Sequence, residues 1–145
     1  MKSLTNTATV KPLIGPFELT DGSDGVDATV DINCLATKRW ILALYFWDRA
    51  ELPYCANIAR HIASALNHMA GHKNMVDPTE REWEQFFRAH PAPFHTVKVE
   101  CAHEGSMVEI QSASGEALAY RKVWDSFEQA GEDARNICQA LNLYA

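Results

Sequence analysis

Two nine-residue segments of this chain resemble each other closely, and this similarity constrains the fold more than any other feature. Residues 59–67 read ARHIASALN and residues 134–142 read ARNICQALN, so six of the nine positions are identical. Self-similarity of this kind within one chain is the signature of a repeated structural unit. The sequence therefore predicts that one supersecondary unit occurs twice.

The similarity continues towards the N-terminus, with a two-residue difference in spacing between the two copies. Three pairs of triplets keep the same order along the chain. They are Phe46-Trp47-Asp48 with Val123-Trp124-Asp125, Val30-Asp31-Ile32 with Val108-Glu109-Ile110, and Phe17-Glu18-Leu19 with Val97-Lys98-Val99. Alanine-rich helices resemble each other by chance, but tryptophan is rare, so its recurrence before both nonapeptides supports a true repeat.

Each copy is predicted to form three β-strands followed by one amphipathic helix. Short runs of alternating apolar and polar residues between turn-forming residues predict the strands, and apolar residues at three- and four-residue intervals predict the helices. The predicted strands are 16–20, 27–33, 39–47, 94–101, 106–112 and 116–124, and the predicted helices are 52–69 and 126–144. Because the third strand of the first copy, 39–47, is almost continuously apolar, we expect it to be central.

The fold class that follows is α+β, with internally duplicated βββα units, antiparallel sheets with packed helices and an extra short linker helix. Residues 77–90 begin with an Asp-Pro-Thr start signal and place aromatic residues on one side, which predicts the linker helix. The predicted division of the chain is a flexible N-terminal segment at 1–15, a first unit at 16–70, a linker at 71–92 and a second unit at 93–145.

Composition and charge restrict the classes of function. The chain is 47% apolar and 22% charged, as expected of a globular protein, and its net charge of −6 opposes direct binding to nucleic-acid phosphates. No apolar run reaches the ~20 residues of a membrane-spanning helix, and no secretory signal opens the sequence, so we expect a cytoplasmic protein without membrane contact. The four cysteines lack metal-site spacing, and we expect them to be reduced and mostly buried.

Acidic residues and tryptophans supply the candidate binding residues. No basic residue lies between Lys11 and Lys38, where five acidic residues accumulate. A second acidic set lies at 125–133, and the alternative interpretation of both sets is that they are solvated turns and a helix N-terminus. Tryptophans are enriched at the energetic centres of interfaces as well as in cores. Trp47 and Trp124 recur in the repeat and are interpreted as structural, which leaves Trp40 and Trp83 freer to contact a partner. The predicted partner-binding residues are Glu18, Asp21, Asp24, Asp27, Asp31, Trp40 and Trp83, although Trp83 could instead roof the junction between the two units.

Part of each copy resembles small accessory proteins encoded by phages and prophages. The resemblance lies in a β-meander followed by a Trp-Asp pair and a helix of the form A-N-x-A-R-x-I-x-x-A-L. Its residues are Ala56, Asn57, Ala59, Arg60, Ile62, Ala65 and Leu66 in the first copy and Ala134, Arg135, Ile137, Ala140 and Leu141 in the second. The resemblance implies a mobile-element origin and accessory roles such as inhibition of host defences.

The second half is also similar in its αβββα order to the double-stranded RNA-binding domain. In that family the last helix begins with a lysine-rich segment that binds phosphates. The corresponding residues 128–133 contain no lysine. Topology can match where function does not, so direct nucleic-acid binding is not expected.

Evidence for catalysis or metal binding is sparse. His61, His68 and His72 are spaced to form one stripe on a helix, but no carboxylate or cysteine completes a zinc ligand set, and surface or boundary positions are expected for them. Cys55 precedes a helix without an evident base, and Cys138 is explained by packing. We therefore predict no catalytic residues, no metal and no cofactor.

Two classes of function remain open on these grounds. The first is a non-catalytic accessory protein that binds a host protein with a basic surface, for example an inhibitor of a defence protein such as a CRISPR-Cas component. The second is a small-ligand binder or enzyme with a pocket between the two units. The sequence leaves the identity of the partner and the oligomeric state open.

Overall fold

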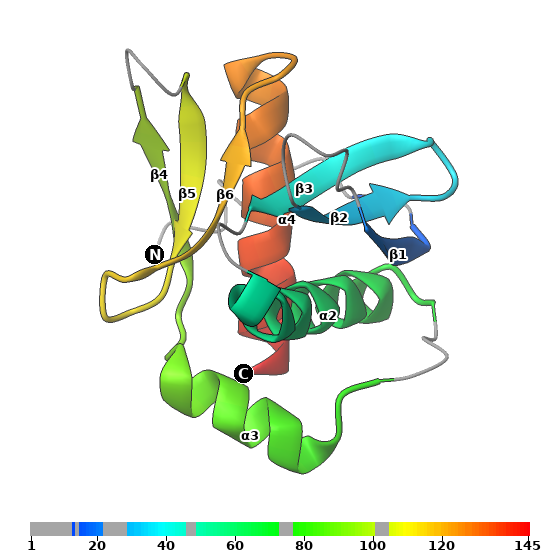
Figure 1. The fold of residues 1–145 in the computed structure, drawn as a ribbon, viewed down its shortest axis with the longest axis vertical. Helices are drawn as coiled ribbons and strands as arrows, with labels where there is room; N and C mark the ends of the chain where they lie inside the picture. Colours follow the sequence, from blue (N-terminus) through cyan, green and yellow to red (C-terminus); the bar gives the residue numbers. More distant parts are fainter. Residues whose placement is uncertain (1–12, 14, 22–28, 46–48, 73–76, 101–104) are drawn as a thin grey trace.

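The computed structural model describes residues 13, 15–21, 29–45, 49–72, 77–100 and 105–145 (Figure 1). Within these residues, two three-stranded antiparallel sheets each precede a long helix, which confirms the α+β class and the two βββα units. The elements are β1 (Phe17–Asp21), β2 (Thr29–Cys34), β3 (Arg39–Tyr45), the 3₁₀ turn η1 (Arg49–Glu51), α2 (Leu52–Met69), α3 (Glu80–Ala89), β4 (His95–Val99), β5 (Met107–Gln111), β6 (Ala117–Lys122) and α4 (Phe127–Tyr144).

Both long helices contain 18 residues and begin where the local sequence favours a helix. Pro53 lies in the first turn of α2, where its missing N–H costs no helical hydrogen bond. Ser126 caps α4, because its side chain accepts a hydrogen bond of 3.1 Å from the backbone N–H of Gln129. The two nonapeptides occupy the same positions in the two helices, so Ile62 in α2 corresponds to Ile137 in α4.

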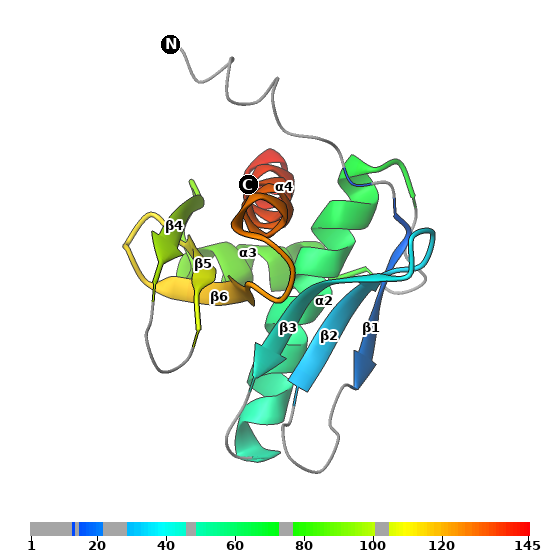
Figure 2. The same cartoon turned by 90° about the horizontal axis from the view of Figure 1, so that it is seen from above.

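The strand order corrects one expectation. The central strands are β2 in the first sheet and β5 in the second, so the prediction that the third strand is central is wrong. β3 lies at the edge of its sheet but remains largely apolar because it runs beside β6, the edge of the other sheet (Figure 2). Contact with the second unit, rather than a central place in the sheet, explains its composition.

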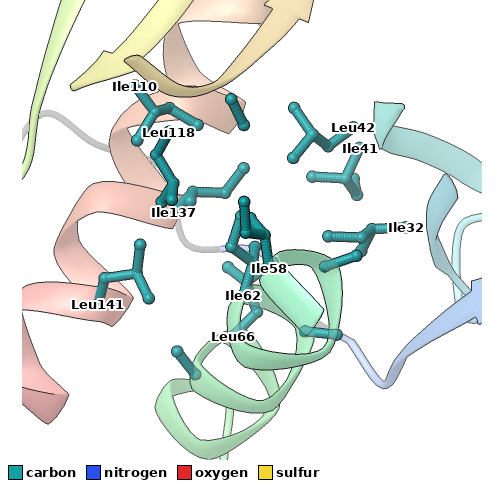
Figure 3. Close-up of a cluster of buried hydrophobic side chains, with 14 of the residues drawn as sticks. Ile32, Ile41, Leu42, Ile58, Ile62, Leu66, Ile110, Leu118, Ile137 and Leu141 are labelled. Carbon is teal, nitrogen blue, oxygen red and sulfur yellow. The ribbon is translucent and has the colours of Figure 1, made fainter. Parts of the chain in front are cut away.

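The two units share one hydrophobic core. α2 packs on the first sheet, α4 packs on the second, and the two helices pack on each other. Buried apolar side chains from both sheets and both helices point towards one another in Figure 3: Ile32, Ile41, Leu42, Ile58, Ile62, Leu66, Ile110, Leu118, Ile137 and Leu141. Since the stripe of each helix faces the other unit as well as its own sheet, neither unit buries its apolar surface alone.

A β-bulge shapes the first sheet at its inner face. Asn33 pairs with Trp40, whereas the preceding residue Ile32 pairs with Leu42, so Ile41 is the extra residue of the bulge. The bulge turns two consecutive residues of β3 into the core, because Ile41 and Leu42 are both fully buried. A regular strand would place only every second residue there.

The second sheet has a bulge at the corresponding place. Gln111 pairs with Ala117 and Ile110 pairs with Ala119, so Leu118 is the extra residue. Leu118 and Ala119 are consecutive and both buried. The internal repeat therefore extends to an irregularity of the strand pairing, which chance similarity of helices does not produce.

An asparagine at the end of each nonapeptide holds the first strand of its own unit. Asn67 accepts a hydrogen bond from the Phe17 N–H (2.7 Å) and donates one to the Phe17 carbonyl (2.9 Å). Asn142 makes the same two contacts with Phe94, at 2.7 and 3.1 Å. Phe17 therefore corresponds to Phe94, and the match of Phe17 with Val97 is wrong by three residues, because a distant helix residue rather than local strand composition sets the register.

Helix α3 covers one end of the helix pair. Its start is fixed by a capping box, in which the Thr79 side chain accepts from the Glu82 N–H (3.1 Å) and the Glu82 carboxylate accepts from the Thr79 N–H (3.0 Å). Arg60 of α2 forms an ion pair with Glu82. Trp83 stacks on Tyr144 of α4, with the ring centroids 4.1 Å apart. The linker helix thus contacts both units.

Candidate functional site at the seam between the units

The candidate site lies along the seam where β3 meets β6. Tyr45 and Lys122 end these strands and pair with corresponding residues of the central strands, so they are equivalent positions of the two units. The Lys122 Nζ atom lies 4.3 Å from the centroid of the Tyr45 ring. Contact between equivalent residues is what an approximate two-fold axis produces, and it brings side chains of both units into one place.

A buried ion cluster occupies this seam. Arg121 is fully buried in β6, and its Nε and Nη2 atoms donate to Oδ2 of Asp133 at 3.1 and 2.9 Å. Arg39 of β3 donates to both Asp133 oxygens, at 3.2 and 2.9 Å. Gln129 donates to the Oδ1 atom of Asp133 at 3.0 Å. One fully buried carboxylate of α4 therefore ties together elements from both units.

The charges of the cluster are balanced. Arg121 also donates to Asp125 at 2.9 Å, so two guanidinium groups meet two carboxylates. The hydrogen bond to Asp133 raises the pKa of Arg39. Burial raises the pKa of Asp125, but hydrogen bonds from Arg121 and the Ser126 N–H outweigh it and hold the pKa below its usual value. The hydrogen bonds of Arg39 and Asp125 therefore favour the ionised forms of both groups over the opposing effect of burial.

Two tryptophans stand on this cluster and face the solvent. The guanidinium carbon of Arg121 lies 3.8 Å from the centroid of the Trp124 ring, a cation–π contact. Trp40 meets Trp124 edge to face, with the centroids 6.3 Å apart and the planes at 84°. The exposed fractions are 60% for Trp40 and 41% for Trp124. The buried guanidinium group of Arg121 therefore supports the tryptophan pair on one side, while the rest of both rings is open to solvent.

Glu18 shares a sheet face with Trp40. Glu18 of β1 pairs with Asn33 of β2, which in turn pairs with Trp40 of β3. Directly paired residues of antiparallel strands point to the same face. Glu18 is exposed, so this outer face carries one predicted acidic residue and one predicted tryptophan.

The other predicted acidic residues do not extend this surface among the described residues. Asp31, in the central strand β2, is only 6% exposed, which contradicts the expectation that it belongs to an exposed acidic segment. Asp21 ends β1, but its side chain, together with Asp24 and Asp27, lies outside the described residues. Whether these residues bind a partner stays a prediction.

Trp83 belongs to an internal aromatic cluster rather than to an open surface. Its side chain is 7% exposed and lies against the rings of His61, Phe86, Phe87 and Tyr144. This environment fits the alternative interpretation, in which Trp83 roofs the junction between the units. A ring buried in this way offers little area to a partner while α3 is docked.

A second candidate site is a partly open cavity of about 160 Å³ between α2 and α3. It combines an aromatic floor with polar side chains and is lined by Tyr54, Asn57, Glu82, Gln85, Phe86, Ala89 and His90. This cavity differs from the predicted pocket between the two units, since it lies between the first unit and the linker helix. Its size matches a single six-membered ring.

The positions of the histidines differ in part from those expected from the sequence, and two of the thiols have raised pKa values. His61, expected at a surface or boundary position, is fully buried. In the part of the chain that the structure describes, no group of three His, Cys, Asp or Glu residues is placed to hold a metal ion. Burial, with the nearby Glu51 charge, raises the pKa of Cys55, and burial raises the pKa of Cys138 to about 12. These two thiols lack the activation that a nucleophile needs.

Sequence reasoning missed the residues that support the tryptophan pair. Asp133 was expected to be solvated at a helix N-terminus, but it is fully buried. A signal was present in the repeat. When the two units are aligned by their strand pairing and helix positions, Arg121 is equivalent to Leu44 and Asp133 is equivalent to Ile58. Opposite charges at two positions that are apolar in the other copy indicate a buried ion pair.

Comparisons with known proteins add no family to this description. Among the described residues, the helices are all too short or too polar to cross a membrane. No family model, no curated protein and no solved structure matches this chain.

Proposed function

We propose that this protein is a non-catalytic binding module that recognises another protein through Trp40 and Trp124. The observation that carries the proposal is the exposure of both indole rings, 60% and 41%, at a seam built from both units. Tryptophan is enriched among the residues that dominate interface energies, and a large aromatic surface left open to water is unfavourable unless something covers it.

The tryptophan pair is also pre-ordered for binding. Arg121 holds Trp124 from below, and Arg121 is itself fixed by Asp133 and Asp125. Trp40 leans on the edge of Trp124. Side chains that already occupy one arrangement lose less conformational entropy on association, so a given contact area yields more affinity.

The proposed partner is a protein that presents basic side chains. The open face of Trp40 suits an arginine or lysine through a cation–π contact, and Glu18 on the same sheet face supplies a carboxylate. The net charge of −6 would accelerate such an encounter. Inhibition of a host defence protein, for example a CRISPR-Cas component, is the role that the resemblance to phage accessory proteins favours, and it stays a prediction.

The test is an affinity measurement on a partner captured from bacterial lysate and then purified. Trp40→Ala should weaken binding at least tenfold, because interface tryptophans typically contribute more than about 1.4 kcal/mol. Tyr54→Ala is the matched control, since Tyr54 is an equally exposed aromatic residue, at 59%, on α2. Equal affinities of the wild type and Trp40→Ala for that partner would refute the proposed surface.

The cavity between α2 and α3 supports a second candidate function, binding of a small planar ligand. Its lining offers Phe86 for stacking and Tyr54, Gln85 and His90 for hydrogen bonds. The same two variants separate the candidates. Loss of affinity for a small aromatic ligand in Tyr54→Ala but not in Trp40→Ala would favour the cavity.

A further inference from the structure

His61 is a fully buried histidine enclosed by aromatic rings of the linker helix. Its ring stacks on Phe86 with the centroids 4.5 Å apart and the planes at 7°. It meets Trp83 edge to face, with the centroids 4.7 Å apart and the planes at 85°. His61 belongs to α2 and both partners belong to α3, so these ring contacts are a large part of how α3 docks on the first unit.

The hydrogen bonding of His61 determines which ring nitrogen carries the proton when the ring is neutral. The Nδ1 atom lies 2.8 Å from the carbonyl oxygen of Asn57, which can only accept, so Nδ1 carries the proton. Nε2 is buried and has no hydrogen-bond partner among the described residues. A proton added at Nε2 would therefore place a positive charge at a fully buried position between the rings of Trp83 and Phe86.

His90, at the other end of α3, is a second histidine of the same junction. It caps the C-terminus of α3 and lies against Phe86, with the ring centroids 5.1 Å apart. Burial lowers its pKa, the Glu116 carboxylate opposes this, and the proximity of His61 lowers the pKa further. Burial is likewise the main reason why the pKa of His61 is lowered. The backbone of Asn57 and the backbone and carboxylate of Glu82 each raise this pKa, but burial outweighs them.

Charged groups reach this junction from α2, from α3 and from the segment just before α3. On α2, Arg60 lowers the pKa of His61 and forms an ion pair with Glu82 of α3. The Thr79 N–H and Arg60 lower the pKa of Glu82 to about 2, so it stays ionised under mild acidity. Asp77 accepts a hydrogen bond from Ser64 of α2, one turn from His61.

Other titratable groups reach this junction from α4 and from the turn between β5 and β6. Tyr144 of α4 stacks on Trp83 and contacts His68, which is exposed. Glu116, in the turn between β5 and β6, acts on His90. The histidines whose rings contact Trp83 or Phe86 of α3 directly are therefore His61 and His90, and histidine is the side chain that ordinarily changes charge between neutral pH and pH 5.

We propose that α3 is a pH-sensitive cover, which docks on the helix pair while His61 and His90 are neutral and is released when mild acidification charges them. The docked state binds fewer protons than the released state, because an exposed histidine titrates near its ordinary value of about 6.5. Docking is therefore fully favourable above that pH and weakens as the pH falls through it towards the lower pKa of the docked form. Release uncovers the apolar sides of Trp83 and Phe86.

This device is independent of the tryptophan pair. α3 lies away from the seam between β3 and β6 (Figure 1), and no residue of the ion cluster contacts it in the described hydrogen bonds and ion pairs. Acidification is therefore expected to change the accessible surface at α3 without changing the binding face proposed above.

The experiment is amide hydrogen exchange of the full-length protein at pH 7.5 and pH 5.5, corrected for the intrinsic pH dependence of exchange. Peptides that cover 80–89 should lose protection several-fold at the lower pH, while those of α4 keep theirs. His61→Phe, which preserves ring stacking but cannot titrate, should reduce this response, and His61→Phe combined with His90→Phe should abolish it. His95→Phe is the matched control at an exposed histidine of β4 and should respond like the wild type.

Three outcomes would overturn the proposal: no loss of protection in the wild type, an equal loss in the double variant, or an equal loss across α3 and α4, which would indicate global unfolding. Should His61→Phe fail to fold at pH 7.5, His90→Phe alone decides. A reduced response in that variant supports the proposal, and a response equal to that of the wild type contradicts it.

Discussion

The two units of this molecule have the same elements in the same order, but they carry different residues at two inner positions, one on the third strand and one on the long helix. The first unit has Leu44 in β3 and Ile58 in α2, and the second has Arg121 in β6 and Asp133 in α4 at the same places. An apolar pair stabilises by leaving water, whereas a buried ion pair roughly balances attraction against desolvation.

This difference shows where the molecule gains a specific arrangement of its two units rather than additional stability. Asp133 accepts hydrogen bonds from Arg121 of its own unit and from Arg39 of the other, which an apolar residue at this position cannot do. We infer that the ion cluster fixes how the two units meet and thereby holds the tryptophan pair. The predictions below test this difference, from the largest expected change in stability to the smallest.

The largest effect is expected where the two units are the same. Ile62→Asp and Ile137→Asp each place an unpaired carboxylate at a fully buried position, which should cost at least ~5 kcal/mol and abolish the cooperative thermal transition. Circular dichroism melting is the measurement. If either variant melted like the wild type, the two helices would not be equivalent in the shared core.

The next effect is expected where the units differ. Asp133→Ala leaves two arginines without their common carboxylate, one of them fully buried, and should cost about 3 to 5 kcal/mol in urea unfolding. The same substitution at the equivalent apolar position, Ile58→Ala, is the matched control and should cost about 2 to 5 kcal/mol through a cavity.

A combined variant separates charge from packing at this position. Arg121→Leu with Asp133→Ile recreates the pair of the first unit and should be more stable than Asp133→Ala, because the buried guanidinium is also removed. It should nevertheless lose the ordered tryptophan pair, which near-ultraviolet circular dichroism reports. Retention of both the stability and that signal would show that the ion cluster has no positioning role.

Smaller losses of unfolding free energy are expected from replacing Asn67 and Asn142, the asparagines that bind the first strand of each unit. Asn67→Ala removes two buried hydrogen bonds to Phe17 and should cost about 2 kcal/mol, while Asn142→Ala, whose bonds to Phe94 are only partly buried, should cost about 1 kcal/mol. Chemical denaturation of the two variants measures both values. A larger loss in Asn142→Ala would reverse the order that burial dictates.

The smallest effect is expected at the proposed binding face. By strand pairing, Trp40 of the first unit is equivalent to Ala117 of the second, so the fold tolerates alanine at this position. Trp40→Ala should change the free energy of unfolding by no more than about 0.5 kcal/mol, because most of the ring is exposed. A loss above 2 kcal/mol would mean that Trp40 serves the fold rather than a partner.

The elements were predictable from the sequence because their signals are local. The interval of apolar residues and Pro53 place α2 at the observed bounds, and Ser126 marks the start of α4. The two βββα units follow from the repeat itself. In contrast, the place of β3 at a sheet edge depends on its contact with β6, which no local pattern encodes.

The site was only partly predictable. Trp40 was identified because tryptophan on a strand without a counterpart in the repeat is unusual, but Arg39 and Arg121 were not identified. Their significance depends on Asp133, which comes from an acidic stretch whose other members are more exposed. Hydropathy treats a charged residue as solvated, and only its partner in space shows otherwise.

The shared core has a consequence for how such a chain can diverge. Two identical units meeting on a two-fold axis would have to carry every substitution twice, so a favourable change on one side of the seam would be imposed on the other. Joining the units through residues 71–92 gives each a high effective concentration of the other and removes that restriction. A single polypeptide built in this way is a tethered dimer, free to carry Arg121 and Asp133 in one unit and Trp40 in the other, each without a counterpart across the axis.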